Sequence, residues 1–270
     1  MPGLWRMSEL WDKPDRLLVL PLAVLAGVLS VAALSLALPA GSGAAVLLLD
    51  HHVHLPANSP FVYPFTVQNL MHLLFFVGLG ELYVRWRIAE RELALTHAGL
   101  LPQEYRAVLG VHNLAPIRTA VKSRYDEEHG FLPSLVDLCI LQFMASRSVD
   151  QTVSVLNSSL ELIQHRLDLR YALLRYLVWV IPTIGFIGTV VGITLALGQI
   201  DPGVTEQPLG EIATALGISF YTTLVALVES AILVLLLNLV QAREESALNR
   251  AGNQTLTNLI NRLHAGDVTT

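Results

Sequence analysis

The chain has 270 residues, of which 53% are hydrophobic and only 14% are charged, and its mean hydropathy is +0.54. This composition excludes both an ordinary soluble domain and an intrinsically disordered chain. A net charge of −5 gives no overall basic surface for nucleic acid, and the single cysteine, Cys139, excludes an internal disulfide framework. The composition therefore indicates a membrane protein.

Two apolar stretches are long enough to cross a bilayer as helices. Leu17–Leu38 has 22 residues and Tyr176–Gly198 has 23, and neither contains a charged side chain. Each would be about 33 Å long as an α-helix, against a hydrocarbon core of about 30 Å. Two less uniform segments, Phe61–Leu82 and Ile212–Val240, complete a prediction of four transmembrane helices.

The lysines and arginines predict how these helices are oriented. Of the 17, three precede the first span, eleven lie between Arg85 and Arg175, and three follow the fourth span. The connections between the first two spans and between the last two contain none. Because positive residues concentrate on the cytoplasmic side, both termini and the long middle segment are predicted to be cytoplasmic.

The predicted fold is an all-α integral membrane protein with four transmembrane helices and long cytoplasmic helical extensions. From Ser134 to Ile181 there is no Gly or Pro, and Ser134 and Asp137 have capping-box spacing, which predicts one long helix running into the third span. The fourth span continues past Val240 with only Gly252 as an interruption. Such extensions exceed what a monomer needs, so we expect oligomerisation.

This organisation divides the chain into five parts. They are a cytoplasmic N-terminus (1–16), two transmembrane helices with a short external loop (17–82), a cytoplasmic helical segment (83–175), two further transmembrane helices (176–240) and a cytoplasmic C-terminal helix (241–270).

The third span combines a proline, small residues and hydroxyls. Pro182 is expected to kink the helix, and the glycines expose backbone along one side, with Gly188 and Gly192 in the small-xxx-small spacing of packed membrane helices. Helix packing does not require the threonines of this span. The glycines are Gly185, Gly188 and Gly192, and the threonines are Thr183, Thr189 and Thr194.

The fourth span contains a carboxylate, Glu229, and the hydroxyls of Ser219, Thr222 and Thr223. Thr222 and Glu229 are seven residues apart, about two helical turns, and so share a face. A carboxylate inside a span is costly and indicates function. The span is longer than a bilayer demands, however, so an interfacial position for Glu229 is the alternative.

Two motifs in these spans resemble the MotA/TolQ/ExbB proton-channel family. GFIGTVVGIT, from Gly185 to Thr194, is similar to the family's glycine-rich span, and ISFYTTLVALVESAI, from Ile218 to Ile232, is similar to the threonine-containing span that follows it. The resemblance covers about the last 100 residues. The sequence differs from ExbB in having Ile218 where a glutamate of that span would align.

The resemblance implies the pore-forming, stator-type subunit of a proton-driven motor in the bacterial inner membrane. In that family, five copies of this subunit surround two copies of a single-span MotB/ExbD/TolR-like partner whose Asp takes up and releases protons. Thr189 and Thr223 correspond to the two pore-facing threonines, with Thr222 as a neighbouring candidate. Glu229 is additional to the family pattern and is a further candidate for the ion path because it is a carboxylate within a span. Pro182 and the three glycines would then pack helices around the pore. No cofactor is implied.

The sequence is also compatible with other functions. No motif of an enzyme is present, such as a P-loop, G-x-S-x-G, H-E-x-x-H or CxxC. A membrane scaffold whose polar span residues only pack helices is the main alternative, and a metalloenzyme using Asp50, His51, His52 and His54 is a third. Gln68 and His72, one turn apart, favour interhelical hydrogen bonds over a proton relay. The sequence does not specify which process such a motor would drive, or whether it would conduct protons or sodium ions.

Overall fold

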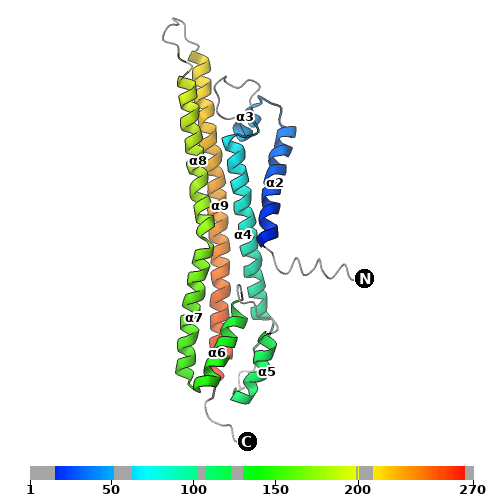
Figure 1. Cartoon of the computed structure of the whole chain (residues 1–270), viewed down its shortest axis with the longest axis vertical. Helices are drawn as coiled ribbons and strands as arrows, with labels where there is room; N and C mark the ends of the chain where they lie inside the picture. The colour runs from blue at the N-terminus through cyan, green and yellow to red at the C-terminus, as the bar shows by residue number, and fades with distance from the viewer. Residues whose placement is uncertain are drawn as a thin grey trace, which may run out of the picture. The chain divides into compact units, whose positions relative to one another are not determined.

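The computed structural model describes residues 16–51, 63–101, 108–122, 130–198, 200 and 209–264. The regular elements in these residues are helices (Figure 1), and no strand occurs among them beyond one bridge between Leu109 and Leu263. The chain divides into two compact units. Among the described residues, the span unit holds those from Arg16 to Val84 and from Leu173 to Asn238, and the extension unit holds those from Arg85 to Ala172 and from Leu239 to His264.

Four helical segments of the described residues are long and apolar enough to cross a membrane. They are Arg16–Ala37, Val67–His97, Val149–Leu197 and Ala215–Arg262. Each overlaps most of one predicted span, so the prediction of four membrane-capable helices is confirmed. Phe61 and Val62, at the start of the predicted second span, lie outside the described residues.

The span unit contains five helices or parts of helices. These are α2 (Arg16–Ala37), α3 (Gly43–Leu49), the first part of α4 (Val67–His97), α8 (Ala172–Leu197) and the first part of α9 (Leu209–Asn258). α3 begins at a regular N-cap, where the Ser42 hydroxyl accepts the Ala45 N–H at 3.2 Å.

Helices of the span unit approach one another at glycines. A methyl group added at Gly27 of α2 would lie 3.2 Å from Phe76 Cβ of α4, and one added at Gly78 of α4 would lie 3.0 Å from a Leu233 methyl of α9. Lipid tails are as apolar as these side chains, so close van der Waals contact at small residues takes the place of a hydrophobic driving force.

The extension unit contains α5 (Val111–Lys122), α6 (Leu132–Ser146), α7 (Val149–Arg170), the second parts of α4 and α9, and a short 3₁₀ turn, η1 (Ile260–Arg262). α6 packs on α5 and α7. Gly252 lets α7 approach α9, because a Cβ there would lie 3.0 Å from a Leu160 methyl. α9 runs through Gly252 without a break, which confirms the predicted continuation of the fourth helix.

The prediction of one helix from Ser134 to Ile181 is wrong at its beginning. α6 ends at Ser146, Arg147 adopts a left-handed conformation (φ 52°), and α7 begins at Val149 with the Ser148 hydroxyl accepting the Gln151 N–H at 3.3 Å. This reversal packs α6 against α7. From Val149 onward the prediction is right, because only Tyr171, whose backbone stays near helical values, separates α7 from α8.

The predicted capping box at Ser134 and Asp137 is also wrong. α6 begins earlier, at Leu132, and the Phe131 N–H donates to Glu92 Oε2 of α4 at 2.8 Å. A carboxylate from another helix thus satisfies an N-terminal N–H that no local side chain reaches. Asp137 instead accepts Arg118 Nε at 2.7 Å, which ties α5 to α6.

Candidate functional site

The hydroxyls of three threonines meet where α8 contacts α9. Thr189 Oγ1 of α8 lies 3.0 Å from Thr222 Oγ1 and 2.6 Å from Thr223 Oγ1 of α9. Thr189 and Thr222 are buried, and Thr223 is half-buried. The structure thus gathers the three threonines of the expected ion path into one threonine cluster, defined here as Thr189, Thr222 and Thr223.

Backbone carbonyls of both helices close the threonine cluster. Thr222 Oγ1 lies 3.0 Å from the carbonyl oxygens of both Gly185 and Ser219, Thr223 Oγ1 lies 3.2 Å from that of Gly185, and Thr189 Oγ1 lies 2.9 Å from that of Ser219. Three hydroxyl protons therefore have more acceptors within reach than they can use at once. The cluster can change the direction of its hydrogen bonds without moving its heavy atoms.

The glycines of α8 make room for this contact. A Cβ at Gly188 would lie 2.9 Å from Val67 Cγ1 of α4 and 3.1 Å from Thr222 Cγ2. A Cβ at Gly185 would overlap Ala226, and one at Gly192 would overlap Ser219. The three glycines thus allow close contacts of α8 with neighbouring helices of the same subunit, near enough for the hydroxyls of α8 and α9 to meet, while their packing around a pore stays a prediction.

Pro182 is compensated by a residue that the sequence analysis missed. Proline has no N–H, so the carbonyl of Val178, four residues earlier in α8, loses its helical donor. Ser230 Oγ of α9 donates to this carbonyl at 2.9 Å. The signal was present in the sequence, because a carbonyl freed within a membrane needs another donor. The sequence could not show which helix supplies it.

Glu229 lies in a buried contact with α4 rather than in the threonine cluster. Its Oε1 is paired with Nδ1 of His72, and Nε2 of His72 lies 2.8 Å from the Leu48 carbonyl of α3. Glu229 is 7% exposed. The interhelical hydrogen bond expected of His72 is therefore confirmed, and its partner is the carboxylate of the fourth predicted span. The Gln68 amide, of which the same was expected, has no hydrogen-bond partner among the described residues.

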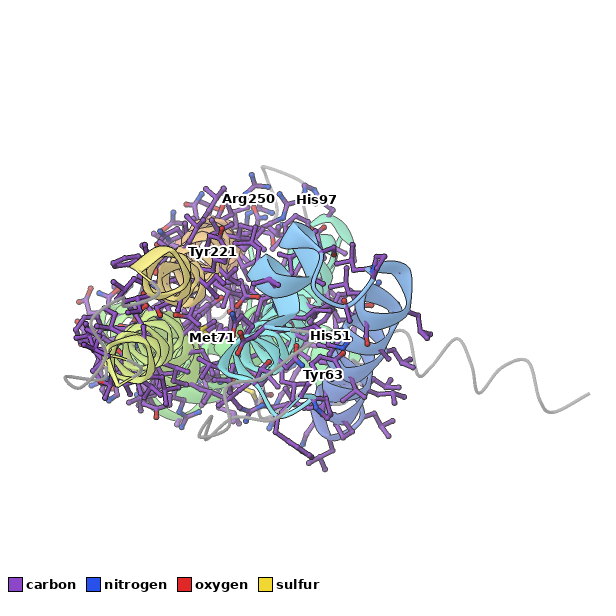
Figure 2. The ribbon with its side chains drawn as sticks, turned by 90° about the horizontal axis from the view of Figure 1, so that it is seen from above. His51, Tyr63, Met71, His97, Tyr221 and Arg250 are labelled. Atoms are coloured by element: carbon purple, nitrogen blue, oxygen red, sulfur yellow. The ribbon has the colours of Figure 1, made fainter. Side chains whose placement is uncertain are left out.

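The polar loop between α2 and α4 offers no metal site among the described residues. His52 and His54 lie outside them, and His51 stacks on Tyr63 with ring centroids 4.0 Å apart (Figure 2). No group of three or more His, Cys, Asp or Glu that could hold a metal ion occurs in the described parts of the chain.

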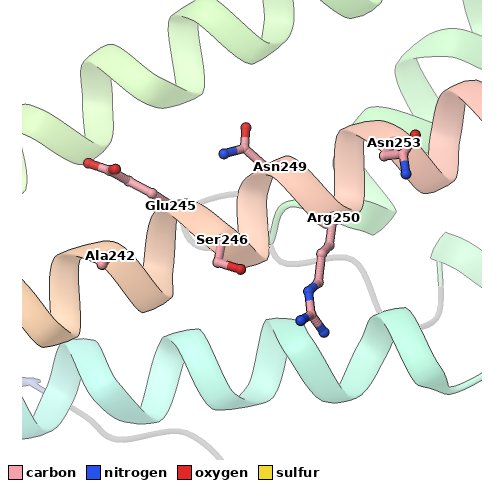
Figure 3. A pocket seen from close by; sticks show the side chains of 6 residues that line it. All are labelled: Ala242, Glu245, Ser246, Asn249, Arg250 and Asn253. Atoms are coloured by element: carbon pink, nitrogen blue, oxygen red, sulfur yellow. The ribbon is translucent and has the colours of Figure 1, made fainter.

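The extension unit contains a hollow along α9 that the sequence analysis did not foresee. Figure 3 shows Glu245 and Asn249 on one side of the helix and Ser246 and Arg250 on the other. All six lining residues come from α9: Ala242, Glu245, Ser246, Asn249, Arg250 and Asn253. A hollow that is lined by a single helix, without a residue from a second element, does not form a reaction site.

The sequence analysis also missed a buried hydrogen bond between Tyr171 and Glu244 in the extension unit. Glu244 is 0% exposed and its Oε2 accepts the Tyr171 hydroxyl at 2.8 Å. Burial raises the pKa of Glu244, while the Tyr171 hydrogen bond and the charge of Arg85 act in the opposite direction. Glu244 lies beyond the predicted end of the fourth span, so only the length of α9 hinted that it would be buried.

Comparison with known proteins covers the part of the chain that carries these features. Residues 126–252 match the model of the MotA/TolQ/ExbB proton channel family. No curated protein and no solved structure matches the chain. The matched stretch includes the threonine cluster, Pro182, the three glycines and Glu229, whereas His72 lies before it. The resemblance drawn from the two span motifs is confirmed by this match of residues 126–252, and the matched family is one of proton channels and not of enzymes.

Proposed function

We propose that the chain is the pore-forming subunit of a proton-driven motor. In this proposal five copies surround a dimeric, single-span partner of the MotB/ExbD/TolR type in the bacterial inner membrane, with both termini in the cytoplasm. The family segment and the four membrane-capable helices support a channel role. The observation that carries the proposal is the threonine cluster, which places adaptable hydroxyls between two apolar helices of the family segment.

The chemistry follows from the low polarity of the surroundings. An ionised Asp of the partner is unfavourable in an apolar pore unless polar neighbours stabilise it. A hydroxyl of the threonine cluster can donate to the carboxylate and, after rotating, accept from the protonated acid. A proton that moves down a potential of 100 mV releases about 2.3 kcal/mol, which can bias one step of the partner relative to the surrounding subunits.

Exposed apolar side chains on the last two spans support assembly within a membrane. Phe186 and Ile187 of α8 are 63% and 52% exposed, and Phe220 and Leu224 of α9 are 57% and 53% exposed. A surface of this kind needs lipid or protein to cover it.

A membrane scaffold is the competing function, and one observation favours it. The hydroxyls of the threonine cluster already find partners within the subunit, and Thr189 is only 5% exposed. In a scaffold these hydrogen bonds would only join α8 to α9.

Substitution of the threonines separates the two functions. Thr189→Val and Thr223→Val keep the shape of the side chain and remove its hydroxyl. The variants would be co-expressed with a single-span partner of the MotB/ExbD/TolR type, reconstituted in vesicles and assayed for partner-dependent proton flux, with native mass spectrometry to count subunits. Thr194→Val is the matched control, because Thr194 is exposed on the same helix and donates only to the Val190 carbonyl of its own turn, at 2.8 Å.

The channel function predicts intact pentamers whose flux falls roughly 100-fold in both variants and stays normal in the control, since a group that handles the proton is lost. Normal flux in both variants would reject the threonine cluster as the ion path. Stable monomers that lack any partner-dependent flux in the wild type would reject the motor itself.

A further inference from the structure

The contact between His72 and Glu229 lies within the span unit, away from water. The two side chains are 12% and 9% exposed, and they come from α4 and α9. A buried carboxylate without compensation is very unfavourable, so its protonation is tied to that of the imidazole beside it.

The hydrogen-bond partners of His72 define which atoms of the pair carry a proton. Nε2 faces the Leu48 carbonyl at 2.8 Å, and a carbonyl can only accept, so Nε2 carries a hydrogen. Nδ1 then faces Glu229 Oε1 either as N–H beside a carboxylate or as a lone pair beside a protonated acid. Both forms contain one proton between Nδ1 and Oε1, and both are neutral overall. The pair therefore stores one exchangeable proton.

Buried polar atoms of the pair and of the α4 turn before His72 have no hydrogen-bond partner within the described part of the chain. They are Glu229 Oε2, both amide atoms of Gln68, and Asn69 Oδ1. Gln68 is 1% exposed and lies one helical turn before His72. Buried polar atoms of this kind are commonly satisfied by internal water. Water at the free Glu229 oxygen would satisfy that atom and would also give the pair a partner for proton exchange.

The pair also lies near the threonine cluster. Thr222 and Glu229 are two turns apart on one face of α9, about 10 Å along the helix. Val67, the residue before Gln68, lies next to Gly188, and Gly188 also lies next to Thr222, since a Cβ at Gly188 would be 2.9 Å from Val67 Cγ1 and 3.1 Å from Thr222 Cγ2. Gln68 thus stands on α4 between the level of the threonine cluster and the level of His72.

We propose that His72 and Glu229 form a second protonatable site in each subunit, which exchanges its proton with the threonine cluster through water held by Gln68. The pair releases the proton from its Nδ1–Oε1 contact to that water, which leaves neutral His72 and the Glu229 carboxylate, and the pair becomes neutral again when water returns a proton. No other titratable side chain of the described residues is paired with it: α3 contributes a carbonyl, and α8 has no charged residue from Tyr176 to Gly198. The role of this second site in transport rests on the proposed channel function, whereas its proton exchange does not.

The chemistry can be tested on the subunit alone, without partner or transport. Infrared difference spectra would be recorded while the pH around the protein in lipid nanodiscs is changed. We expect a carboxyl signal that is lost in Glu229→Gln, shifted in His72→Gln and unchanged in Glu161→Gln, where an exposed carboxylate of α7 is removed. Spectra of Glu229→Gln that equal those of the wild type would overturn the proposal.

The role is tested by partner-dependent flux measured over a range of pH. His72→Gln and Glu229→Gln should each lower flux at least about tenfold and flatten its pH dependence, and the double variant should be no worse than either single one, since both lose the same proton. His165→Gln, which alters a histidine of α7 outside the span unit, is the control. If the pair variants do not assemble, Gln68→Leu leaves the pair intact, removes the proposed water ligand and should lower flux in intact pentamers.

The two proposals fail in different ways. Unchanged flux and pH dependence in the pair variants and in Gln68→Leu, together with inactive threonine variants, would overturn the second site and leave the channel function standing. Normal flux in the threonine variants would count against the ion path proposed above, while the infrared result would still decide whether the pair exchanges a proton.

Discussion

At the scale of single residues, the span unit is shaped by how it satisfies buried polar atoms. Pro182 takes one donor from α8, and the Ser230 hydroxyl of α9 replaces it on the Val178 carbonyl. The same helix pair places the Thr222 hydroxyl on the Gly185 carbonyl and the Thr189 hydroxyl on the Ser219 carbonyl. Because no water hydrates a bilayer interior, each of these bonds both fixes a side chain and joins two helices.

The link between Pro182 and Ser230 gives a double-mutant prediction. Ser230→Ala should lower the free energy of unfolding by about 1 kcal/mol, because the Val178 carbonyl loses its donor. In a Pro182→Ala background the same substitution should cost much less, since the new alanine would supply the helical N–H that proline lacks. Unfolding in mixed micelles measures all four proteins. Equal costs in the two backgrounds would show that Ser230 does not compensate for the proline.

A second residue-scale prediction concerns Glu244 in the extension unit. Burial raises the pKa of its carboxyl above the ordinary 4.5, against the effects of the Tyr171 hydroxyl and of the charges on Arg85 and Arg170, while the charge of Glu245 raises it further. The folded state therefore holds the proton more tightly than the unfolded state. The stabilisation that this tighter proton binding gives to the folded state is complete below pH 4.5 and is lost as the pH rises through the raised pKa of Glu244.

We expect the stability of the protein to fall as the pH rises through this range, and Glu244→Gln to remove that part of the dependence. Glu161→Gln, on the exposed face of α7, should leave the pH dependence as it is in the wild type. Thermal unfolding at a series of pH values checks the prediction. A Glu244→Gln profile parallel to that of the wild type would contradict it.

At the scale of elements, the sequence predicted the membrane helices well and the extension unit less well. Long charge-free stretches locate α2 and α8 because a bilayer sets their length. The break between α6 and α7 was missed because it contains neither Gly nor Pro; the signal was Ser148, whose hydroxyl caps α7.

Contacts between helices that are distant in the sequence could not be predicted, for a different reason. Periodicity placed Thr222 and Glu229 on one face of α9, but it could not show that Thr222 meets Thr189 of α8 or that Glu229 meets His72 of α4. Spacing along one helix fixes a face, whereas pairing between helices depends on their rotation and depth. The family motifs supplied the threonines and gave no indication of His72, which lies outside the matched segment.

The contact between α8 and α9 gives a prediction at the element scale. Gly185→Ala would place a methyl group against Ala226 and 3.0 Å from the Thr222 carbonyl oxygen. The two helices must then separate, and we expect a loss of about 1–3 kcal/mol in unfolding free energy. Gly217→Ala, on the exposed side of α9 with no atom within 4 Å of the added methyl, should be neutral or stabilising by up to about 1 kcal/mol. Similar losses in both variants would mean that helix propensity and not close packing governs the effect.

At the scale of the whole molecule, the distribution of positive charge and the exposed apolar surface are two independent properties. Both are those expected of a protein that spans a membrane. The outward side chains of α2, such as Leu17, Leu22 and Leu29, are 82%, 62% and 59% exposed, as expected of a helix in contact with lipid. All 17 lysines and arginines lie outside the two connections that are predicted to be external. An apolar surface places helices in a membrane, and only the positive charges say which way they point.

The orientation can be measured by labelling single cysteines. Ser42→Cys and Gly203→Cys lie in the two connections without positive residues and should react with a membrane-impermeant maleimide in intact spheroplasts. Ser123→Cys lies in the arginine-rich middle segment and should react only after the membrane is opened. The native Cys139 is a weak competitor, because it is 0% exposed and burial raises the pKa of its thiol to about 12, which keeps it from forming the reactive thiolate. Labelling of Ser123→Cys in intact cells, with Ser42→Cys protected, would invert the topology and place the extension unit outside the cytoplasm, where it could not be reached by a cytoplasmic effector of the motor.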